Sequence, residues 1–340
     1  MQPTIRDLAL AADVSLATVD RVLNGRPGVR ADTVKRVNAA IARIGFTRNV
    51  SAAALARGRP LRFAFLLPRS RELFVEAIRA RIEEANRSLA PEMIQIDPIP
   101  LDGGDPHLIA SQIEALDGAG LDGVAVMAPE APPTRDAILH LRERVPHVVS
   151  FVSGHGEMPD MPLVGIDNRA AGATAGRLMG RFLCGRRGAV VVVGETMTLR
   201  NEIERRLGFD RVLQADFPAL RVLPSLETYR DAGRARRILA TALGNVSDLA
   251  GIYIPSTEAR IGVGAVTELR ADRPLVVIAH ERTAFTEGAL QLGQVDALIA
   301  QDPGHLVRSA VRRLRASREG RTPIASQEDI RIEVLLPENL

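Results

Sequence analysis

The stretch TIRDLALAADVSLATVDRVLNGRPGVRADTVKRVNAAIARIG, from Thr4 to Gly45, decides the fold of the first part of the chain. Its apolar residues recur at helical spacing in three short segments, which predicts helices after Thr4, after Ser15 and over about 31–44. Thr4 and Ser15 are suitable N-caps for the first two helices. Two short helices joined by a tight turn are typical of the helix-turn-helix, whose second helix enters the major groove of DNA.

Basic residues concentrate at the same end of the chain. Residues 1–62 hold eleven Lys or Arg and four Asp, a net charge of +7, whereas the remainder carries −4 and the whole chain +3. A basic head on a mildly acidic body is typical of a protein that binds nucleic acid at one end. A solvated charged face would give the same charge pattern, so the motif inside the head carries the interpretation.

The order of residues in this head resembles the LacI family of bacterial transcription regulators. The match is tightest in VSLATVDRVLN, from Val14 to Asn24, and continues to an Asn49-x-x-Ala52-x-x-Leu55 pattern. The resemblance implies a helix-turn-helix domain over 1–48, then a hinge helix and linker over 49–60.

The resemblance also implies a role for each position in the head. Arg21 would read a guanine through its two-pronged donor, while Leu16 and Ala17 offer only apolar contact to bases. Packing in the head's own core is the alternative for Leu16. Asp20 departs from the Ser that the family most often has. The implied phosphate contacts are Thr4, Ser15, Thr18, Asn24 and Arg26, and the implied minor-groove residues are Asn49, Ala52 and Leu55, of which Leu55 would wedge between base steps.

From Arg62 onwards, short apolar runs alternate with helical segments. One series begins with RFAFLLP at 62–68 and a second with AVVVVGE at 189–195. Continuous apolar strands that alternate with helices predict parallel sheets buried on both faces. The expected fold is therefore an α-helical head followed by a two-lobed α/β body. We expect the first lobe to hold about 61–182 and 302–320, and the second about 183–301 and 321–340.

The body resembles the periplasmic sugar-binding fold, more loosely than the head resembles its family. The matching pieces include DNRAAG at 167–172 and QDP at 301–303. Ligands of such folds bind beyond the carboxyl ends of strands, here between the lobes. The effector contacts expected on this basis are Phe74, Asp167, Arg205, Tyr229, Ser256, His280 and Gln301.

Alternatives stay open for several of these effector contacts. Asp167 can cap the helix that follows it, Arg205 can be a surface residue, and a core role suits Phe74 equally well. His280 stands where many family members have Asp, and Ser256-Thr257 where many have Asn-Asp.

Residue counts exclude several other classes of site. Cys184 is the single cysteine and Lys35 the single lysine, which excludes a cysteine zinc cluster, a Walker phosphate loop and a pyridoxal Schiff base. No run approaches the ~18 apolar residues of a membrane span, and the first residues lack a signal peptide's apolar stretch, so we expect a cytoplasmic protein. No metal or cofactor is expected.

The sequence thus predicts a homodimeric regulator that binds operator DNA and a sugar or polyol effector. A sugar-metabolising enzyme and a solute-binding protein are the alternatives, although no G-x-S-x-G or H-E-x-x-H motif is present. The sequence leaves open whether the protein represses or activates.

Overall fold

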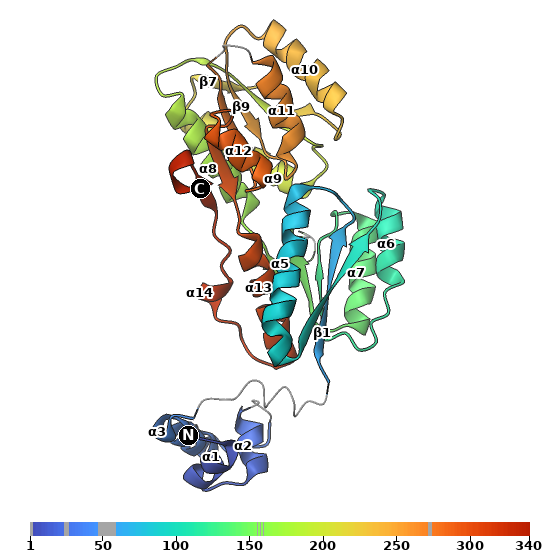
Figure 1. Cartoon of the computed structure of the whole chain (residues 1–340), viewed down its shortest axis with the longest axis vertical. Coiled ribbons are helices and arrows are strands. Elements are labelled where there is room, and N and C mark those ends of the chain that lie inside the picture. The colour runs from blue at the N-terminus through green and yellow to red at the C-terminus, as the bar shows by residue number, and fades with distance from the viewer. Residues whose placement is uncertain are drawn as a thin grey trace.

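The computed structural model describes residues 3–23, 27–46, 59–154, 156, 158, 160–270 and 274–340. It contains a small helical head and a body of two α/β lobes, as Figure 1 shows. No helix among the described residues is long and apolar enough to cross a bilayer.

The head consists of the three predicted helices, α1 (Ile5–Ala12), α2 (Leu16–Leu23) and α3 (Ala31–Ile44). Thr4 caps α1 in a reciprocal capping box with Asp7, and Gly45 ends α3 in the left-handed conformation. The helices enclose a small core that includes Leu8, Val19 and Val37. Local capping and one apolar stripe per helix are thus sufficient to form this unit.

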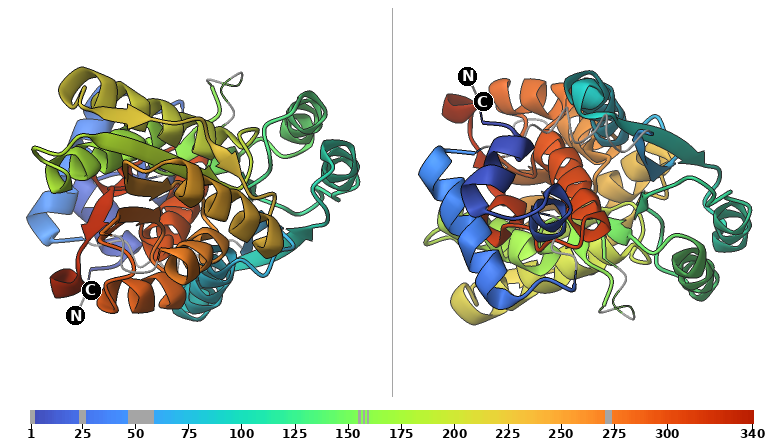
Figure 2. Two further views of the ribbon diagram at one scale, coloured as in Figure 1. Left: turned by 90° about the horizontal axis from the view of Figure 1, so that it is seen from above. Right: turned by 90° about the horizontal axis from the view of Figure 1, so that it is seen from below.

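The first lobe is built on a parallel sheet with the strand order β2-β1-β3-β4-β5. Helices α6 and α7 cover one face, while α5 and α13 cover the other (Figures 1 and 2). The elements are β1 (Leu61–Pro68), α5 (Leu73–Leu89), η1 (Ala90–Glu92), β2 (Ile94–Leu101), α6 (Pro106–Glu114), β3 (Gly123–Val126), α7 (Pro132–Arg144), β4 (Val148–Phe151), β5 (Leu163–Val164) and α13 (Pro303–Arg318).

The second lobe is built on a sheet with the order β12-β11-β10-β9-β6-β7, to which β8 adds through β6; only β12 runs antiparallel. Helices α8 and α9 pack on one face, and α10, α11 and α12 on the other. The elements are α8 (Asn168–Phe182), β6 (Gly188–Gly194), α9 (Arg200–Asp216), β7 (Leu220–Val222), β8 (Leu226–Glu227), α10 (Ala232–Asn245), β9 (Leu249–Ile254), α11 (Ala259–Leu269), β10 (Val276–His280), α12 (Ala284–Gln291), β11 (Ala297–Ala300), β12 (Glu333–Leu335) and η2 (Pro337–Asn339). The prediction that the second lobe holds 321–340 is wrong for α14 (Ala325–Glu328), because this short helix packs on α13 of the first lobe, where Arg312 donates to the Glu328 carboxylate at 2.7 Å.

The chain passes between the lobes after β5, after β11 and after α14. The prediction that the first lobe extends to residue 182 is wrong for α8, because this helix packs against α9, β10 and β11 of the second lobe. An amphipathic helix reveals in its sequence which face is buried, but not which sheet buries it.

Glycines allow α8 and α9 to pack at very short range. A Cβ on Gly172 would lie 1.8 Å from the carbonyl oxygen of Arg205, and a Cβ on Gly208 would lie 2.0 Å from that of Arg169. The two backbones therefore touch at positions where only glycine fits. This approach fixes where α9 places Arg205.

We predict that Gly172→Ala lowers the free energy of unfolding by about 1–3 kcal/mol, because the added methyl group forces the two helices apart. Gly264→Ala is the matched control, since a Cβ there meets no atom within 4 Å and helical alanine is favoured. Urea unfolding followed by circular dichroism checks both variants. Equal stability of the two would contradict the close α8–α9 packing.

Candidate nucleic-acid interface and interlobe site

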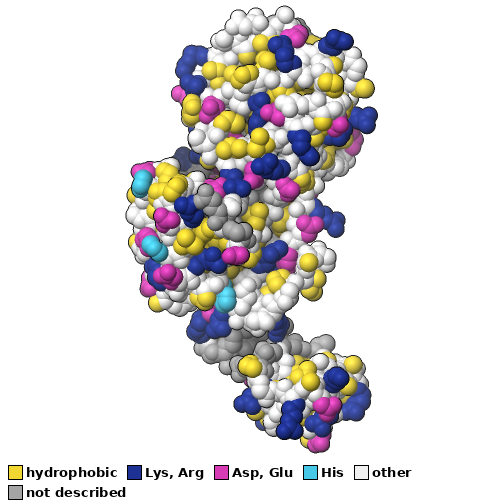
Figure 3. All heavy atoms as spheres, turned by 180° about the vertical axis from the view of Figure 1, so that it is seen from behind, with side chains coloured by type: hydrophobic (Ala, Val, Ile, Leu, Met, Phe, Trp, Pro, Cys, Tyr) yellow, Lys and Arg dark blue, Asp and Glu magenta, His cyan; other side chains and the backbone are white. Residues whose placement is uncertain are grey.

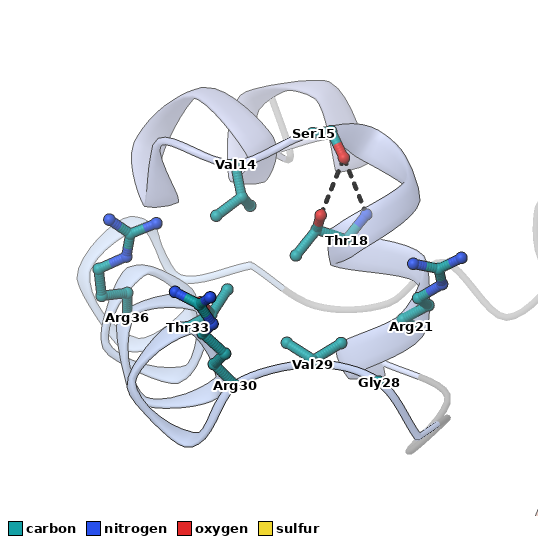
Figure 4. Close-up of a pocket in the computed structure, with 9 residues that line it drawn as sticks. All are labelled: Val14, Ser15, Thr18, Arg21, Gly28, Val29, Arg30, Thr33 and Arg36. Atoms are coloured by element: carbon teal, nitrogen blue, oxygen red, sulfur yellow. Dashed lines mark hydrogen bonds between the residues drawn. The ribbon is translucent and has the colours of Figure 1, made fainter.

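Helix α2 presents the predicted base-reading residues to solvent. Ser15 caps the helix, because its Oγ accepts a hydrogen bond from the Thr18 backbone NH at 3.1 Å and lies 2.9 Å from the Thr18 hydroxyl (Figure 4). Leu16 is 48% exposed, and Ala17 and Arg21 are exposed as well. The core alternative for Leu16 is therefore wrong, and α2 carries the three side chains on an accessible surface.

Beside this surface lies a pocket of about 340 Å³ that joins α2 to the start of α3. Figure 4 shows three guanidinium groups around it, from Arg21 of α2, Arg30 before α3 and Arg36 of α3. Its lining residues are Val14, Ser15, Thr18, Arg21, Gly28, Val29, Arg30, Thr33 and Arg36. Guanidinium forks and hydroxyl groups at a helix start form a suitable environment for a phosphate oxygen.

Arg30, Thr33 and Arg36 were missed in the sequence analysis. The signal was available, since Arg30 and Thr33 flank the start of the helix predicted over 31–44, where free backbone NH groups attract anions. Within the described chain, none of the pocket's three arginines is paired with a carboxylate; Arg36 donates to the carbonyl oxygen of Asp13 at 3.2 Å. Figure 3 shows further Lys and Arg side chains spread over the head.

Several predicted DNA contacts cannot be placed. Asn24, Arg26, Asn49, Ala52 and Leu55 all lie outside the described residues. Thr4 is described, and its hydroxyl group and backbone NH both bond to the Asp7 carboxylate. Thr4 therefore serves α1 as a cap in this structure.

In the body, neighbouring strands of the second lobe end in polar residues that converge on Arg205. Its guanidinium donates to the Asn168 Oδ1 at 2.9 Å, to the Pro255 carbonyl oxygen at 2.8 Å and to the Glu281 Oε1 at 2.7 Å. Gln301 donates to the same Glu281 oxygen at 3.1 Å. We call Asn168, Arg205, Glu281 and Gln301 the buried hub, since none is more than 3% exposed.

The structure thus brings together two of the predicted effector contacts, Arg205 and Gln301. Ser256 lies near them, buried beside Pro255 at the end of β9. Asn168 and Glu281 were missed, although each directly follows a residue that was selected. The expectation that ligands bind beyond the carboxyl ends of strands identifies this edge of the sheet. It does not tell which of two adjacent residues points towards Arg205.

His280 lies inside the second lobe rather than on its surface. Its Nε2 and the Tyr253 hydroxyl are 2.8 Å apart, and the Tyr253 ring stacks on Phe209 with centroids separated by 4.3 Å. Burial, helped by the positive charge of Arg205, lowers the pKa of His280 well below its usual value. A neutral imidazole therefore completes the core in this arrangement of the lobes.

Three other predicted effector contacts do not join the hub. Phe74 is fully buried among the core residues of the first lobe, which confirms the core role that the sequence left open for it. Asp167 caps α8 by accepting a hydrogen bond from the Ala170 backbone NH at 3.0 Å. Tyr229 is 56% exposed, with the Arg234 guanidinium 4.8 Å from its ring centroid.

Ion pairs join the two lobes beside the hub. Arg230 of the second lobe pairs with Glu72 of the first and also with Glu195, which follows β6. On another side, the Arg200 guanidinium lies 2.6 Å from the Glu130 carboxylate. Arg230 has a φ of 61°, a left-handed conformation that is unfavourable for a residue with a side chain. This strained turn directs its guanidinium across the lobe boundary.

Glu202 adds another buried carboxyl group to this region. It accepts a hydrogen bond from the Glu195 backbone NH at 2.8 Å and is 1% exposed. Burial, and then the negative charge of Glu195, raise its pKa from 4.5 to about 7. Glu202 therefore changes charge close to neutral pH.

Two family profiles match the chain. "Bacterial regulatory proteins, lacI family" matches residues 4–49, and "Periplasmic binding protein domain" matches residues 63–322. The chain belongs to the family of periplasmic binding protein domains. The match of the head to the lacI profile confirms the resemblance found in the sequence, and the two profiles together confirm the two-part fold.

Curated relatives of the chain are regulators by name. It is 31% identical over 168 residues to the maltose regulon regulatory protein MalI of Escherichia coli (strain K12), which is 49% of this chain and 47% of that protein. It is 30% identical over 128 residues to catabolite control protein A of Priestia megaterium, 38% of this chain and 37% of that one. The matched regions thus span about half the length of these relatives or less.

Solved structures resemble the body. A solute-binding protein from Burkholderia graminis C4D1M in complex with D-arabinose aligns with a TM-score of 0.72 at 22% identity, over 83% of this chain and 96% of that one. A putative LacI transcriptional regulator from Bacteroides fragilis aligns with a TM-score of 0.71 at 19% identity, over 83% and 98%. At such identities the likeness establishes the fold.

The buried Glu202 predicts a pH dependence of stability. Because its pKa is higher in the folded chain than the ordinary 4.5, folding favours the protonated form. The wild-type free energy of unfolding should therefore fall by up to about 3 kcal/mol as the pH rises from 4.5 through 7. Glu202→Gln should remove this decrease, whereas Glu83→Gln, an exposed control on α5, should keep it. Urea unfolding between pH 5 and 8 measures both, and identical pH profiles for wild type and Glu202→Gln would contradict the assignment.

Proposed function

We propose that this chain is a sequence-specific, DNA-binding transcription repressor of the lacI family that acts as a homodimer in the cytoplasm. The observation that carries the proposal is the exposed side of α2, where Leu16, Ala17 and Arg21 lie beside the three-arginine pocket. An exposed leucine next to guanidinium groups that form no ion pair with a described carboxylate suits base edges flanked by phosphates. Two heads related by two-fold symmetry would read an inverted repeat.

We further propose that a small polar effector, a sugar, polyol or derivative, binds between the lobes and controls operator affinity. Three buried acceptor atoms support this class, since the Glu202 Oε1, the Glu281 Oε2 and the Gln301 Oε1 have no hydrogen-bond partner among the described residues. Hydroxyl groups of a sugar can donate to all of them. The similarly folded solute-binding protein in complex with D-arabinose supports the same class. An effector regulates DNA binding only if it binds two arrangements of the lobes unequally.

An enzymatic function receives less support. His280 and Glu281 are adjacent and could in principle serve as an acid–base pair. His280, however, bonds to Tyr253 and Glu281 to Arg205. Both groups are thus engaged with protein partners, and we assign no catalytic step and no cofactor.

The DNA-binding proposal predicts that the full-length wild type selects an inverted-repeat duplex from a random DNA library. Arg21→Ala should weaken binding to that duplex by about 1–3 kcal/mol and relax selection at one position of each half-site, because a base contact is lost. Lys35→Ala, on the exposed side of α3, removes the same charge and should leave the preferred sequence unchanged. Anisotropy titrations and repeated selection measure both effects. Failure of the wild type to enrich any sequence would refute the proposal.

The effector proposal predicts that calorimetry with a panel of pentoses, hexoses and polyols detects a ligand of the wild type. Arg205→Lys should weaken its binding by roughly tenfold, about 1.4 kcal/mol, since lysine cannot hold Asn168, Glu281 and the Pro255 carbonyl together. Arg206→Lys is the control, because Arg206 pairs with Asp210 outside the hub. A ligand whose affinity is the same in all three proteins would place the effector elsewhere.

A further inference from the structure

A further buried carboxylate lies in the first lobe, outside the hub. Asp122 precedes β3 and is 3% exposed. Its two oxygens accept both prongs of the Arg59 guanidinium at 2.8 and 2.9 Å, the Arg62 backbone NH at 3.0 Å and the Arg318 Nε at 3.1 Å. We call Arg59, Asp122 and Arg318 the linker anchor.

The three residues of the anchor come from three separate segments of the chain. Arg59 is the first described residue after the segment that follows the head, and it directly precedes β1. Arg318 is the last residue of α13, and the first residue of that helix follows β11 of the second lobe closely. Asp122 therefore connects the beginning of the body to the helix with which the chain enters the first lobe from the second.

The sequence next to Asp122 makes this contact possible. A Cβ on Gly123 would lie 2.9 Å from Leu314 of α13 and 3.0 Å from the His147 carbonyl oxygen, so β3 and α13 approach more closely than a larger residue permits. Arg318 lies one helical turn after Leu314, on the same side of α13. The close approach thus brings its guanidinium to Asp122.

Ionisation of Asp122 is maintained despite its burial. Burial alone would raise its pKa, but the bonds from Arg59, from the Arg62 NH and from Arg318 lower it overall. Charge-assisted hydrogen bonds to one buried carboxylate are stronger than bonds between neutral groups, although both guanidinium groups are about half exposed. The anchor therefore ties Arg59 and Arg318 to a single buried charge.

Helix α13 links the linker anchor to the hub. It begins two residues after Gln301 of the hub and ends at Arg318 of the anchor. Its 16 residues correspond to about 24 Å of rigid helix. It packs along α5 and against β3, β4 and β5, and Figure 1 shows it beside α5. A displacement of one end of this helix must therefore move the other.

We propose that Asp122 is a positioning residue for operator binding, which fixes the linker to the end of α13 through Arg59 and Arg318. The head's placement on DNA then depends on where the second lobe holds α13. This inference rests on the proposed DNA-binding function and assigns Asp122 no contact with DNA.

Simple electrostatics makes the opposite prediction for one variant. If these residues acted only through their charges, loss of the negative Asp122 would strengthen DNA binding and loss of Arg59 would weaken it. If the anchor positions the linker, both losses weaken specific binding. The sign of the Asp122→Asn effect therefore separates the two explanations.

The experiment uses the full-length protein and the duplex selected by the wild type. Arg59→Gln and Asp122→Asn should each lower affinity for this duplex by roughly 2- to 30-fold, the range for residues that couple distant parts. The double variant should bind the duplex with an affinity no lower than that of the more weakly binding single variant. The reason is that all three proteins have lost the same junction. Arg62→Gln is the matched control, because it removes the same charge three residues away, where the side chain pairs with Asp97 instead.

The comparison remains decisive even if Asp122→Asn fails to fold. Arg59 is about half exposed, with 51% of its side chain accessible, so Arg59→Gln preserves the body. It should weaken specific binding more than Arg62→Gln does, while both reduce binding to a random duplex equally. Tighter binding by Asp122→Asn, or equal effects of Arg59→Gln and Arg62→Gln on the selected duplex, would overturn the anchor. Absence of any selected duplex would instead refute the proposed function itself.

Discussion

The buried ion pair between Arg205 and Glu281 is the interaction on which the interlobe region depends. The atoms are 2.7 Å apart, and the two side chains are 1% and 0% exposed. Burying two charges costs several kcal/mol each, which their attraction repays only with good geometry and further hydrogen bonds. Here Asn168, the Pro255 carbonyl and Gln301 supply those bonds. The pair is thus better understood as fixing the ends of α8, β9, β10 and β11 relative to α9 than as a source of stability.

This position for Arg205 is set by backbone packing. Gly172 and Gly208 let α8 and α9 touch, and the carbonyl oxygen that a Cβ on Gly172 would strike belongs to Arg205 itself. Asn168 lies one turn before Gly172, at the start of the same helix. The glycines therefore determine both the residue that donates and one residue that accepts. In the sequence the two glycines are only small residues within helical segments. In the structure their close packing determines the position of the Arg205 guanidinium.

The head was more predictable from sequence than the site in the body. Capping by Thr4, the left-handed Gly45 and one apolar stripe per helix are local signals, and all three predicted helices are present. The alternation of strands and helices likewise predicted two sheets. Which polar residue at a strand end faces inward depends on long-range packing: His280 and Glu281 are neighbours, yet one joins Tyr253 and the other Arg205. Partners 76 residues apart, such as Arg205 and Glu281, leave no local pattern.

Helix α13 reaches both the buried hub and the linker anchor. Gln301 of the hub lies two residues before the helix begins, and Arg318 of the anchor is its last residue. Both partners of the Arg205–Glu281 pair in the hub are buried, whereas in the anchor only Asp122 is buried and both guanidinium groups are about half exposed. The interlobe pair of Arg230 and Glu72 has the same half-exposed character. Exposed charges are screened by salt, while a fully buried pair tolerates little displacement. The hub therefore holds its end of α13 more firmly than the anchor holds the other, and a rotation of the second lobe would reach the anchor through this helix.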